Sequence, residues 1–178
     1  GQVYVKTIFH ERSSKSKLNA WLHPDLVGFS FPVTMWENAL IQLSAEIGSH
    51  LVKFYSFELK RELNLHNLRE AFFQTVSNSS WAHYSYLVTA KISEEESFFE
   101  ELNRLSQRFG VGIIVLDIKN QLCSRVVLQS QCKSELDWQT MNKLAKENPD
   151  FRQFLSDVAR DIKAKKVYES DYDPILRD

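Results

Sequence analysis

The sequence predicts a mixed α/β domain in which strands and helices alternate along the chain. Three observations support this class. Runs rich in Val, Ile, Tyr and Phe are separated by stretches whose apolar residues recur every three or four positions. Capping patterns and glycines mark where several of those stretches begin and end. A length of 178 residues suits one domain, or one domain with a small appendage.

The predicted strands are residues 3–11, 26–31, 52–60, 85–92 and 111–117, with 125–129 as a further candidate. The Val, Ile and Leu run of 111–117 is typical of a central strand that is buried on both faces. Side chains alternate along a strand, so in 52–60 the side chains of Ser56, Glu58 and Lys60 share one face. A carboxylate and an ammonium side by side on an aromatic strand are costly to bury.

The predicted helices are residues 34–48, 64–77 and 93–109, a short helix from 137 and a longer one from 149. Thr34-x-x-Glu37 and Ser93-x-x-Glu96 match the capping box, and Asn148-Pro149 is a cap followed by proline. The apolar stripes predict the core, with Trp36, Leu40, Leu43, Ile47, Leu65, Leu68, Phe72, Val76, Phe98, Leu102, Leu105, Phe109, Trp138, Met141, Leu144, Phe151, Leu155, Val158 and Ile162. The tail after Lys166 is expected to be loose.

We therefore expect a core over residues 1–133 and a helical extension over 134–178. The net charge of −1 means that DNA binding would depend on local basic clusters or on another domain. Cys123 and Cys132 lack metal-ligand spacing and predict reduced thiols in a cytoplasmic protein. No apolar run of membrane length and no signal peptide is visible, so no membrane partner is expected.

Glu58-Leu59-Lys60 is the strongest candidate for chemistry. Metal-dependent phosphodiester hydrolysis needs hard oxygen ligands, an activated water and positive charge near the phosphate. Glu58 and Lys60 on one strand face supply a ligand and a cation, and Pro24-Asp25 before the preceding strand supplies a second carboxylate. Shared ligation requires the two carboxylates to lie within about 4–6 Å of each other. The predicted helix 34–48 separates the two strands in sequence.

The acid-x-Lys pattern occurs two more times, in Asp117-Ile118-Lys119 and Asp161-Ile162-Lys163. The Asp161 occurrence lies in a helical stripe, where the two charges diverge around the axis. The Asp117 occurrence ends a strand and runs into a polar loop with no helix after it. Only Glu58-Leu59-Lys60 combines an upstream Pro-Asp, an aromatic strand and a following helix.

The pattern Pro24-Asp25 … Glu58-x-Lys60 resembles the PD-(D/E)XK nuclease superfamily. Longer stretches look like the C-terminal domain of bacterial restriction-locus proteins of the HrgA type, in which a winged-helix domain precedes a nuclease-like domain. These stretches are Trp21-Leu22-His23-Pro24-Asp25-Leu26-Val27-Gly28, Tyr55-Ser56-Phe57-Glu58-Leu59-Lys60, Phe73-Gln74-x-Val76-Ser77-Asn78-Ser79-Ser80-Trp81 and Glu147-Asn148-Pro149-Asp150-Phe151. The resemblance implies a restriction-endonuclease-like fold, a mixed central sheet flanked by helices with a helical C-terminal extension.

The resemblance also implies roles. Asp25, Glu58 and the Leu59 carbonyl would hold Mg²⁺, with Mn²⁺ as substitute, Lys60 would position the water, and Gln74 would support the substrate. The substrate would be double-stranded DNA, cut in bacterial restriction or defence, and the resemblance allows a homodimer. The start at Gly1 leads us to expect a fragment of a longer protein whose N-terminal winged-helix domain is absent.

The candidate substrate contacts are His23, Gln74, Ser77, Asn78, Lys15 and Lys17. Each has a structural alternative: a hydrogen-bonded histidine, a polar position on a helix surface, a loop of turn-forming residues, and a solvated basic turn. His10 and Glu11 close the first strand and could face the same cleft. An alternative to the enzyme is a catalytically inactive module that keeps the nuclease fold and binds modified DNA or a partner protein.

Overall fold

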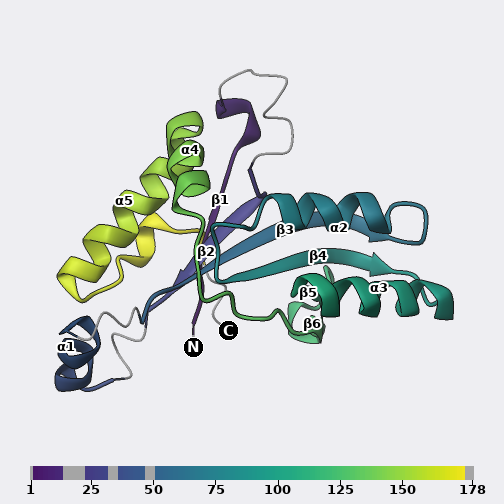
Figure 1. Cartoon of the computed structure of the whole chain (residues 1–178), viewed down its shortest axis with the longest axis horizontal. Helices are drawn as coiled ribbons and strands as arrows, with labels where there is room; N and C mark the ends of the chain where they lie inside the picture. The colour runs from purple at the N-terminus through teal and green to yellow at the C-terminus, as the bar shows by residue number, and fades with distance from the viewer. Residues whose placement is uncertain (1, 14–22, 32–35, 47–50, 175–178) are drawn as a thin grey trace.

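A computed structural model describes residues 2–13, 23–31, 36–46 and 51–174. It contains one six-stranded sheet in the order β1-β2-β3-β4-β5-β6, so neighbouring strands follow one another in sequence (Figure 1). The β1–β2, β2–β3 and β5–β6 pairs are antiparallel, whereas β3–β4 and β4–β5 are parallel. The predicted mixed α/β class, with helices against a mixed sheet, is confirmed.

The strands are β1 (Tyr4–Thr7), β2 (Leu26–Ser30), β3 (Lys53–Leu63), β4 (Tyr84–Ile92), β5 (Gly112–Val115) and β6 (Arg125–Leu128). The α-helices are α1 (Asn38–Glu46), α2 (Leu68–Ser77), α3 (Glu96–Phe109), α4 (Trp138–Glu147) and α5 (Pro149–Ala164). Two parallel connections need long crossovers, which α2 and α3 supply. No helix in the described part of the chain is long and apolar enough to cross a membrane.

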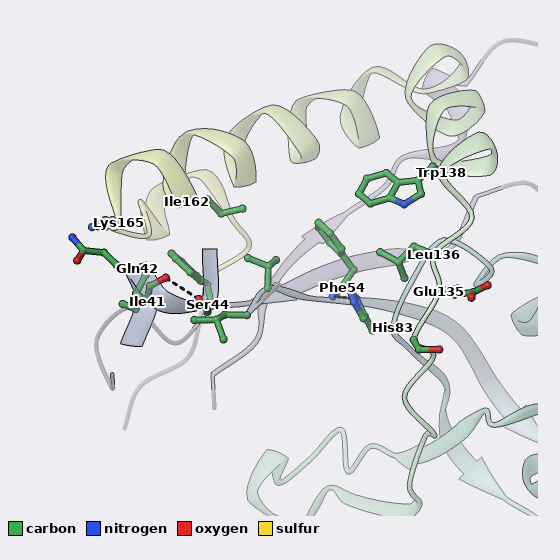
Figure 2. A pocket seen from close by; sticks show the side chains of 14 residues that line it. Ile41, Gln42, Ser44, Phe54, His83, Glu135, Leu136, Trp138, Ile162 and Lys165 are labelled. Atoms are coloured by element: carbon green, nitrogen blue, oxygen red, sulfur yellow. Dashed lines mark hydrogen bonds between the residues drawn. The ribbon is translucent and has the colours of Figure 1, made fainter. Parts of the chain in front are cut away.

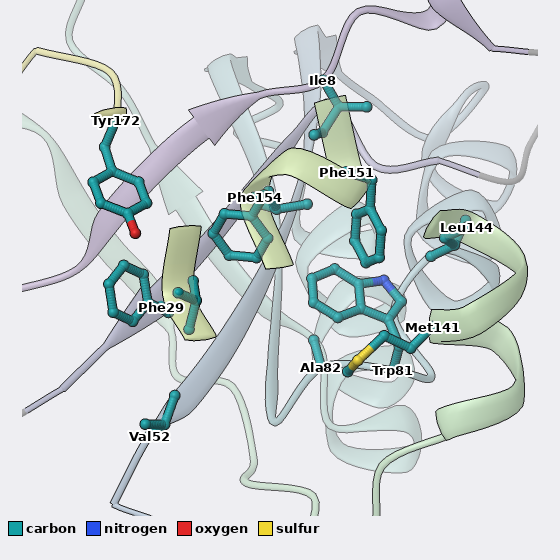
Figure 3. Packing of buried hydrophobic residues seen from close by; sticks show 12 residues of the cluster. Ile8, Phe29, Val52, Trp81, Ala82, Met141, Leu144, Phe151, Phe154 and Tyr172 are labelled. Atoms are coloured by element: carbon teal, nitrogen blue, oxygen red, sulfur yellow. The ribbon is translucent and has the colours of Figure 1, made fainter. Parts of the chain in front are cut away.

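Two hydrophobic clusters lie on the same face of the sheet. One joins α4 and α5 to Val27 and Phe29 of β2, with Trp81 packed edge-on against Phe151 at a centroid distance of 4.9 Å (Figure 3). The other joins α2 and α3 to Leu87 and Ile113. The register pairs Val27 with Ser56, and Glu58 with Leu87, so both clusters cover the face that carries Glu58. Apolar burial against this single face stabilises the domain.

The opposite face of the sheet carries aromatic rings that belong to neither cluster. Tyr55, Phe57, Tyr84 and Tyr86 lie side by side with interplanar angles of 7–20°. A Cβ on Gly112 would meet the Tyr86 ring at 2.4 Å, so only glycine lets this ring lie across β5. This uncovered face explains why 111–117 is not buried on both sides as predicted: Ile114, on the same face as Gly112, is half-buried.

Several predicted boundaries are wrong for local reasons. The first strand ends at Thr7 rather than residue 11, because a 3₁₀ turn, η1 (His10–Arg12), follows it. α2 begins at Leu68 rather than residue 64, since the side chain of Asn64 accepts from the amides of His66 and Asn67 and holds a turn there. β3 is longer than predicted and runs to Leu63.

Of the predicted helix ends, those at Asn148 and Gly110 are confirmed and the one at Ser93 is wrong. Asp137 and Asn148 cap α4 and α5 through their side chains, the second as predicted. Ser93 does not cap α3: its amide donates to the Leu63 carbonyl at 2.9 Å, which keeps it extended beyond β4, and α3 begins at Glu96. Gly110 ends α3 in the left-handed region as predicted. Thr34 and Gly48 lie outside the described residues.

Some predicted core positions are exposed rather than buried. The exposed ones are Trp36, Leu40, Leu43, Leu65, Phe109, Trp138 and Ile162. Among the described positions of α1 the buried ones are Ile41 and Ser44 instead, so the described part of the predicted apolar stripe is exposed. Periodicity identifies an apolar helix face but not whether the chain supplies a partner for it. Ile47 is outside the described residues.

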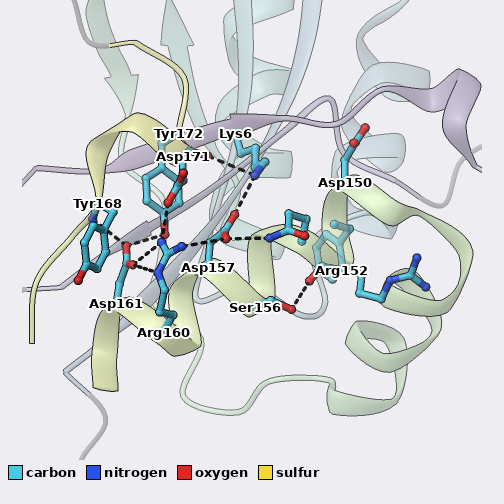
Figure 4. A network of polar contacts seen from close by, with 12 residues as sticks. Lys6, Asp150, Arg152, Ser156, Asp157, Arg160, Asp161, Tyr168, Asp171 and Tyr172 are labelled. Atoms are coloured by element: carbon cyan, nitrogen blue, oxygen red, sulfur yellow. Dashed lines mark hydrogen bonds and ion pairs between the residues drawn. The ribbon is translucent and has the colours of Figure 1, made fainter. Parts of the chain in front are cut away.

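The tail from Val167 to Pro174, the part that the structure describes, is bonded to the domain, contrary to the prediction of a loose end. Tyr172 is buried and its hydroxyl donates to Asp161 at 2.9 Å, while the Asp173 amide donates to the Val5 carbonyl at 2.8 Å. Arg160 bridges Asp161 and Asp171, both at 2.7 Å (Figure 4). These contacts attach the tail to α5 and to the edge strand β1.

Candidate active site

Asp25 and Glu58 meet where β2 begins beside the middle of β3. The last backbone pair of these strands is Leu26 with Phe57, and Asp25 and Glu58 stand one step beyond it. The Asp25 carboxylate accepts the Leu59 amide at 2.7 Å. The helix between the two strands therefore does not keep them apart, and Asp25 lies close enough to Glu58 for its charge to act on that carboxyl.

Lys60 joins Glu58 to helix α2. Its ammonium donates to Glu58 Oε1 at 2.9 Å and to Gln74 Oε1 at 3.0 Å. The alternation of the strand puts Glu58 and Lys60 on one face, and the β3–α2–β4 crossover lays α2 over that face. The Glu58 side chain is 1% exposed and that of Lys60 is 28% exposed, so the pair is a buried acid with a cation that reaches solvent.

Asn78, just after α2, holds the other side of Glu58. Its Nδ2 donates to Glu58 Oε2 at 3.1 Å and to the His23 carbonyl at 3.2 Å. Asn78 is itself buried, and the Trp81 indole and the Ser56 hydroxyl both donate to its carbonyl. These bonds fix the turn after α2, so Asn78 presents its amide to Glu58 in one orientation.

His10, which the sequence placed at the end of the first strand with a possible position in the same cleft, contacts Asp25. Its Nε2 lies 2.9 Å from Asp25 Oδ1, and its side chain is 48% exposed. Asp25 thus has one oxygen bonded by His10 and the other by the Leu59 amide. The only sequence signal was the position of His10 at the end of the predicted first strand. Glu11, named with it, is exposed on the same turn.

The electrostatics separate the two acids. Burial acts to raise the pKa of Asp25, but the hydrogen bonds from His10 and Leu59 outweigh it and hold the pKa below its usual range. Burial raises the pKa of Glu58, with the nearby Asp25 charge adding to this effect, although Lys60 opposes it. The bond to Asp25 raises the pKa of His10. Unequal carboxylates beside a lysine are typical of functional sites, and also of structural networks.

His23 is inside the protein rather than at the surface. It is 2% exposed, and neither ring nitrogen has a hydrogen-bond partner within the described residues. Burial lowers the pKa of His23 to about 4. Its backbone carbonyl, not its ring, is what contacts the site through Asn78.

Of the remaining predicted substrate residues, the structure describes Ser77 alone. Ser77 is exposed at the end of α2, and no described hydrogen bond links its side chain to Glu58 or Lys60. Lys15 and Lys17 lie outside the described residues. Lys133, which the sequence did not single out, donates to the Ser79 carbonyl at 3.0 Å on the far side of the turn after α2.

The rival acid-x-Lys occurrences have local roles. Asp117 accepts the amides of Lys119 and Asn120, both at 2.9 Å, and so closes its own turn. Asp161 is completely buried on α5 and binds Arg160, Tyr168 and Tyr172. Glu58 is the one acid of the three that binds the lysine of its own motif in the described contacts.

The donor set suits a hard cation. No group of three or more His, Cys, Asp or Glu side chains within the described ranges is placed to hold a metal. Asp25 and Glu58 instead offer four carboxylate oxygens, each with one protein hydrogen bond and a second lone pair left for a ligand. The N–H and C=O of a strand residue point to the same side, so the Leu59 carbonyl faces the Asp25 side, beyond the end of β2. Mg²⁺ prefers such oxygens and keeps several waters.

An apolar cavity of about 800 Å³ lies elsewhere, between α1, the start of β3 and the ends of α4 and α5 (Figure 2). Phe31, Phe54, Leu136, Trp138 and Ile162 are among its lining residues. Neither Asp25 nor Glu58 lines it. The site formed by Asp25 and Glu58, called the carboxylate centre below, is therefore polar and separate from this cavity.

Comparisons with protein-family models, curated proteins and solved structures find no match for this chain.

Proposed function

We propose that this chain is a metal-dependent DNA endonuclease domain of the PD-(D/E)XK type, acting on double-stranded DNA in the cytoplasm in bacterial restriction or defence. The observation that supports it is the contact of Lys60 with a buried Glu58, beside Asp25 of the neighbouring strand. Both parts of the two-part sequence pattern thus meet at one strand junction.

In this proposal Asp25, Glu58 and the Leu59 carbonyl hold Mg²⁺ or Mn²⁺. The bound cation supplies positive charge at the phosphate and lowers the pKa of a coordinated water. Lys60 holds a water by donating a hydrogen bond to the water oxygen. Its ammonium also places positive charge where the phosphate gains negative charge. Gln74 keeps the ammonium of Lys60 in place, and Asn78 keeps Glu58 from rotating.

The test is cleavage of supercoiled and linear duplex DNA with Mg²⁺ or Mn²⁺, with EDTA as the blank. Lys60→Met keeps the aliphatic stem and removes the ammonium, and we expect a loss of about 10²–10³ in rate. Lys119→Met is the matched control, since Lys119 is the exposed lysine of a rival acid-x-Lys motif. Absence of cleavage with either metal, or equal rates for Lys60→Met and wild type, would contradict the proposal.

A second candidate is a non-catalytic module that binds modified DNA or a partner protein. It is favoured by the net charge of −1, since a nuclease acting alone usually needs a stronger phosphate-binding field. Calorimetry with Mn²⁺ separates the two. Mn²⁺ binding by wild type that is lost in both Asp25→Ala and Glu58→Ala supports the enzyme. If wild type binds no Mn²⁺ and both variants bind DNA as wild type does, the result supports the module.

A further inference from the structure

The turn that carries His10 is held by the junction of α4 and α5. The Asp150 carboxylate accepts the Phe9 amide at 3.2 Å and the Arg12 guanidinium at 2.7 Å. Asn148 donates from its side-chain amide to the Phe9 carbonyl at 3.2 Å and to the Ser13 hydroxyl at 2.8 Å. Both ends of the turn Phe9–Ser13 are therefore bonded to two residues about 140 positions later.

The two anchoring residues are themselves fixed. Asn148 is fully buried, and its Oδ1 caps α5 by accepting the amides of Asp150 and Phe151 at 2.8 and 3.1 Å. The buried ring of Phe151 packs on Trp81 in the core. A rigid helix start thus presents the Asn148 amide and the Asp150 carboxylate to the turn.

The consequence falls on Asp25. A carboxylate on a short side chain can rotate about its last bond unless both oxygens are bonded. The Leu59 amide holds Oδ2 and His10 holds Oδ1, so the plane of this carboxylate is set by one backbone group and one side chain. Partners of this kind orient metal-ligating carboxylates and typically change metal affinity by about 10–100-fold when removed.

We infer that His10 is a positioning residue for Asp25, and that Asn148 and Asp150 place it. The inference rests on the proposed function, in which Asp25 holds a divalent cation. It gives the Asn148-Pro149-Asp150 motif a role at the site, because the start of α5 holds the turn that carries His10.

The experiment is calorimetric titration of the full chain with Mn²⁺, after thermal melting has verified that each variant is folded. We expect His10→Ala to weaken Mn²⁺ binding about 10–100-fold. His10→Gln retains a side-chain N–H donor and should recover most of the affinity. Glu11→Gln changes the exposed neighbour on the same turn and should leave the affinity unchanged.

Asp150→Ala releases the turn without touching Asp25, so it should weaken Mn²⁺ binding in the same direction. Because Asp150 acts through His10, the double variant His10→Ala with Asp150→Ala should bind no more weakly than His10→Ala alone. Additive losses would overturn the anchoring role. In cleavage assays at saturating Mn²⁺, His10→Ala should lower kcat and leave the KM for DNA nearly unchanged.

Asp25→Ala distinguishes the two levels of the proposal. If Asp25→Ala leaves Mn²⁺ affinity unchanged, the proposed metal site is wrong. If Asp25→Ala abolishes binding while His10→Ala binds as tightly as wild type, the metal site stands and the role of His10 is wrong. Equal affinities of His10→Gln and His10→Ala would also contradict it, since a donor in place of the imidazole should orient Asp25.

Discussion

The ammonium of Lys60 lies 3.0 Å from Oε1 of Gln74, so a residue of helix α2 fixes the position of a residue of strand β3. Gln74 is half-buried, and its hydrogen bond with Lys60 joins α2 to the sheet. An uncharged acceptor orients an ammonium without competing strongly with Glu58 for its charge. Through its contact with Lys60, Gln74 is joined to the carboxylate centre and is not simply a polar residue on the surface of α2.

Gln74→Ala should therefore slow DNA cleavage about 10–100-fold, since Lys60 would lose one of its two fixed bonds and move from its place. The effect should appear in single-turnover rates at saturating DNA. Glu70→Ala, an exposed change on the same helix, is the control and should match wild type. Equal rates for Gln74→Ala and Glu70→Ala would show that Glu58 alone positions Lys60.

Asn78→Ala should lower the free energy of unfolding by about 2–3 kcal/mol, because a buried carboxylate oxygen and the His23 carbonyl each lose their donor. Urea denaturation followed by circular dichroism measures this change. Ser77→Ala is the neighbouring control and should stay within about 0.5 kcal/mol of wild type, as exposed positions usually do. A similar small loss for Asn78→Ala would mean that water replaces its amide.

His23 should make stability depend on pH. Its pKa is about 4 in the folded protein and 6.5 when unperturbed, so between these values the unfolded chain binds a proton that the folded protein does not. The free energy of unfolding should thus fall as pH drops from about 6.5 to 4, by at most about 3 kcal/mol. His23→Leu, measured beside wild type in EDTA, should remove this component and leave those of other groups. Parallel pH profiles would contradict the assignment.

Asp161→Ala should destabilise the protein by about 3 kcal/mol, since the Tyr172 hydroxyl and the Tyr168 amide lose their acceptor. Tyr172→Phe removes one of these bonds and should cost about 1 kcal/mol. Lys163→Ala, the exposed lysine two residues on, serves as the control for α5. Chemical denaturation measures the free energy of unfolding of all three variants. An Asp161→Ala variant as stable as Lys163→Ala would show that the bonds from Tyr168 and Tyr172 do not stabilise the fold.

The sequence predicted the parts of the fold that depend on local chemistry. Strand alternation placed Glu58 and Lys60 on one face, and Asn148 and Gly110 were recognised as helix ends because capping needs only neighbouring residues. The Asp25–Glu58 junction was predicted from a pattern and required the β2–β3 pairing to bring it together. Sequence order alone did not determine that pairing.

What the sequence could not predict depends on partners far along the chain. The His10–Asp25 bond and its anchoring by Asp150 join segments 15 and about 140 residues apart, and no local periodicity encodes either. Trp138 was assigned to the core from helical spacing, yet it is 64% exposed, because spacing does not reveal which surface the fold covers. His23 was predicted as a substrate contact or a hydrogen-bonded histidine, and the fold buries its ring without a hydrogen-bond partner among the described residues.

The Asp173–Val5 bond has a consequence for biosynthesis. Val5 and the edge strand β1 are synthesised before residues 148–173, which hold the outer edge of this strand and the His10 turn. β1 can pair with β2 early. The hydrogen bonds to its outer edge and to the turn that carries His10 form only after α5 and residues 165–173 have emerged. Asp25 and Glu58 would then acquire their final geometry only after residues 148–173 have emerged, when most of the sheet has formed.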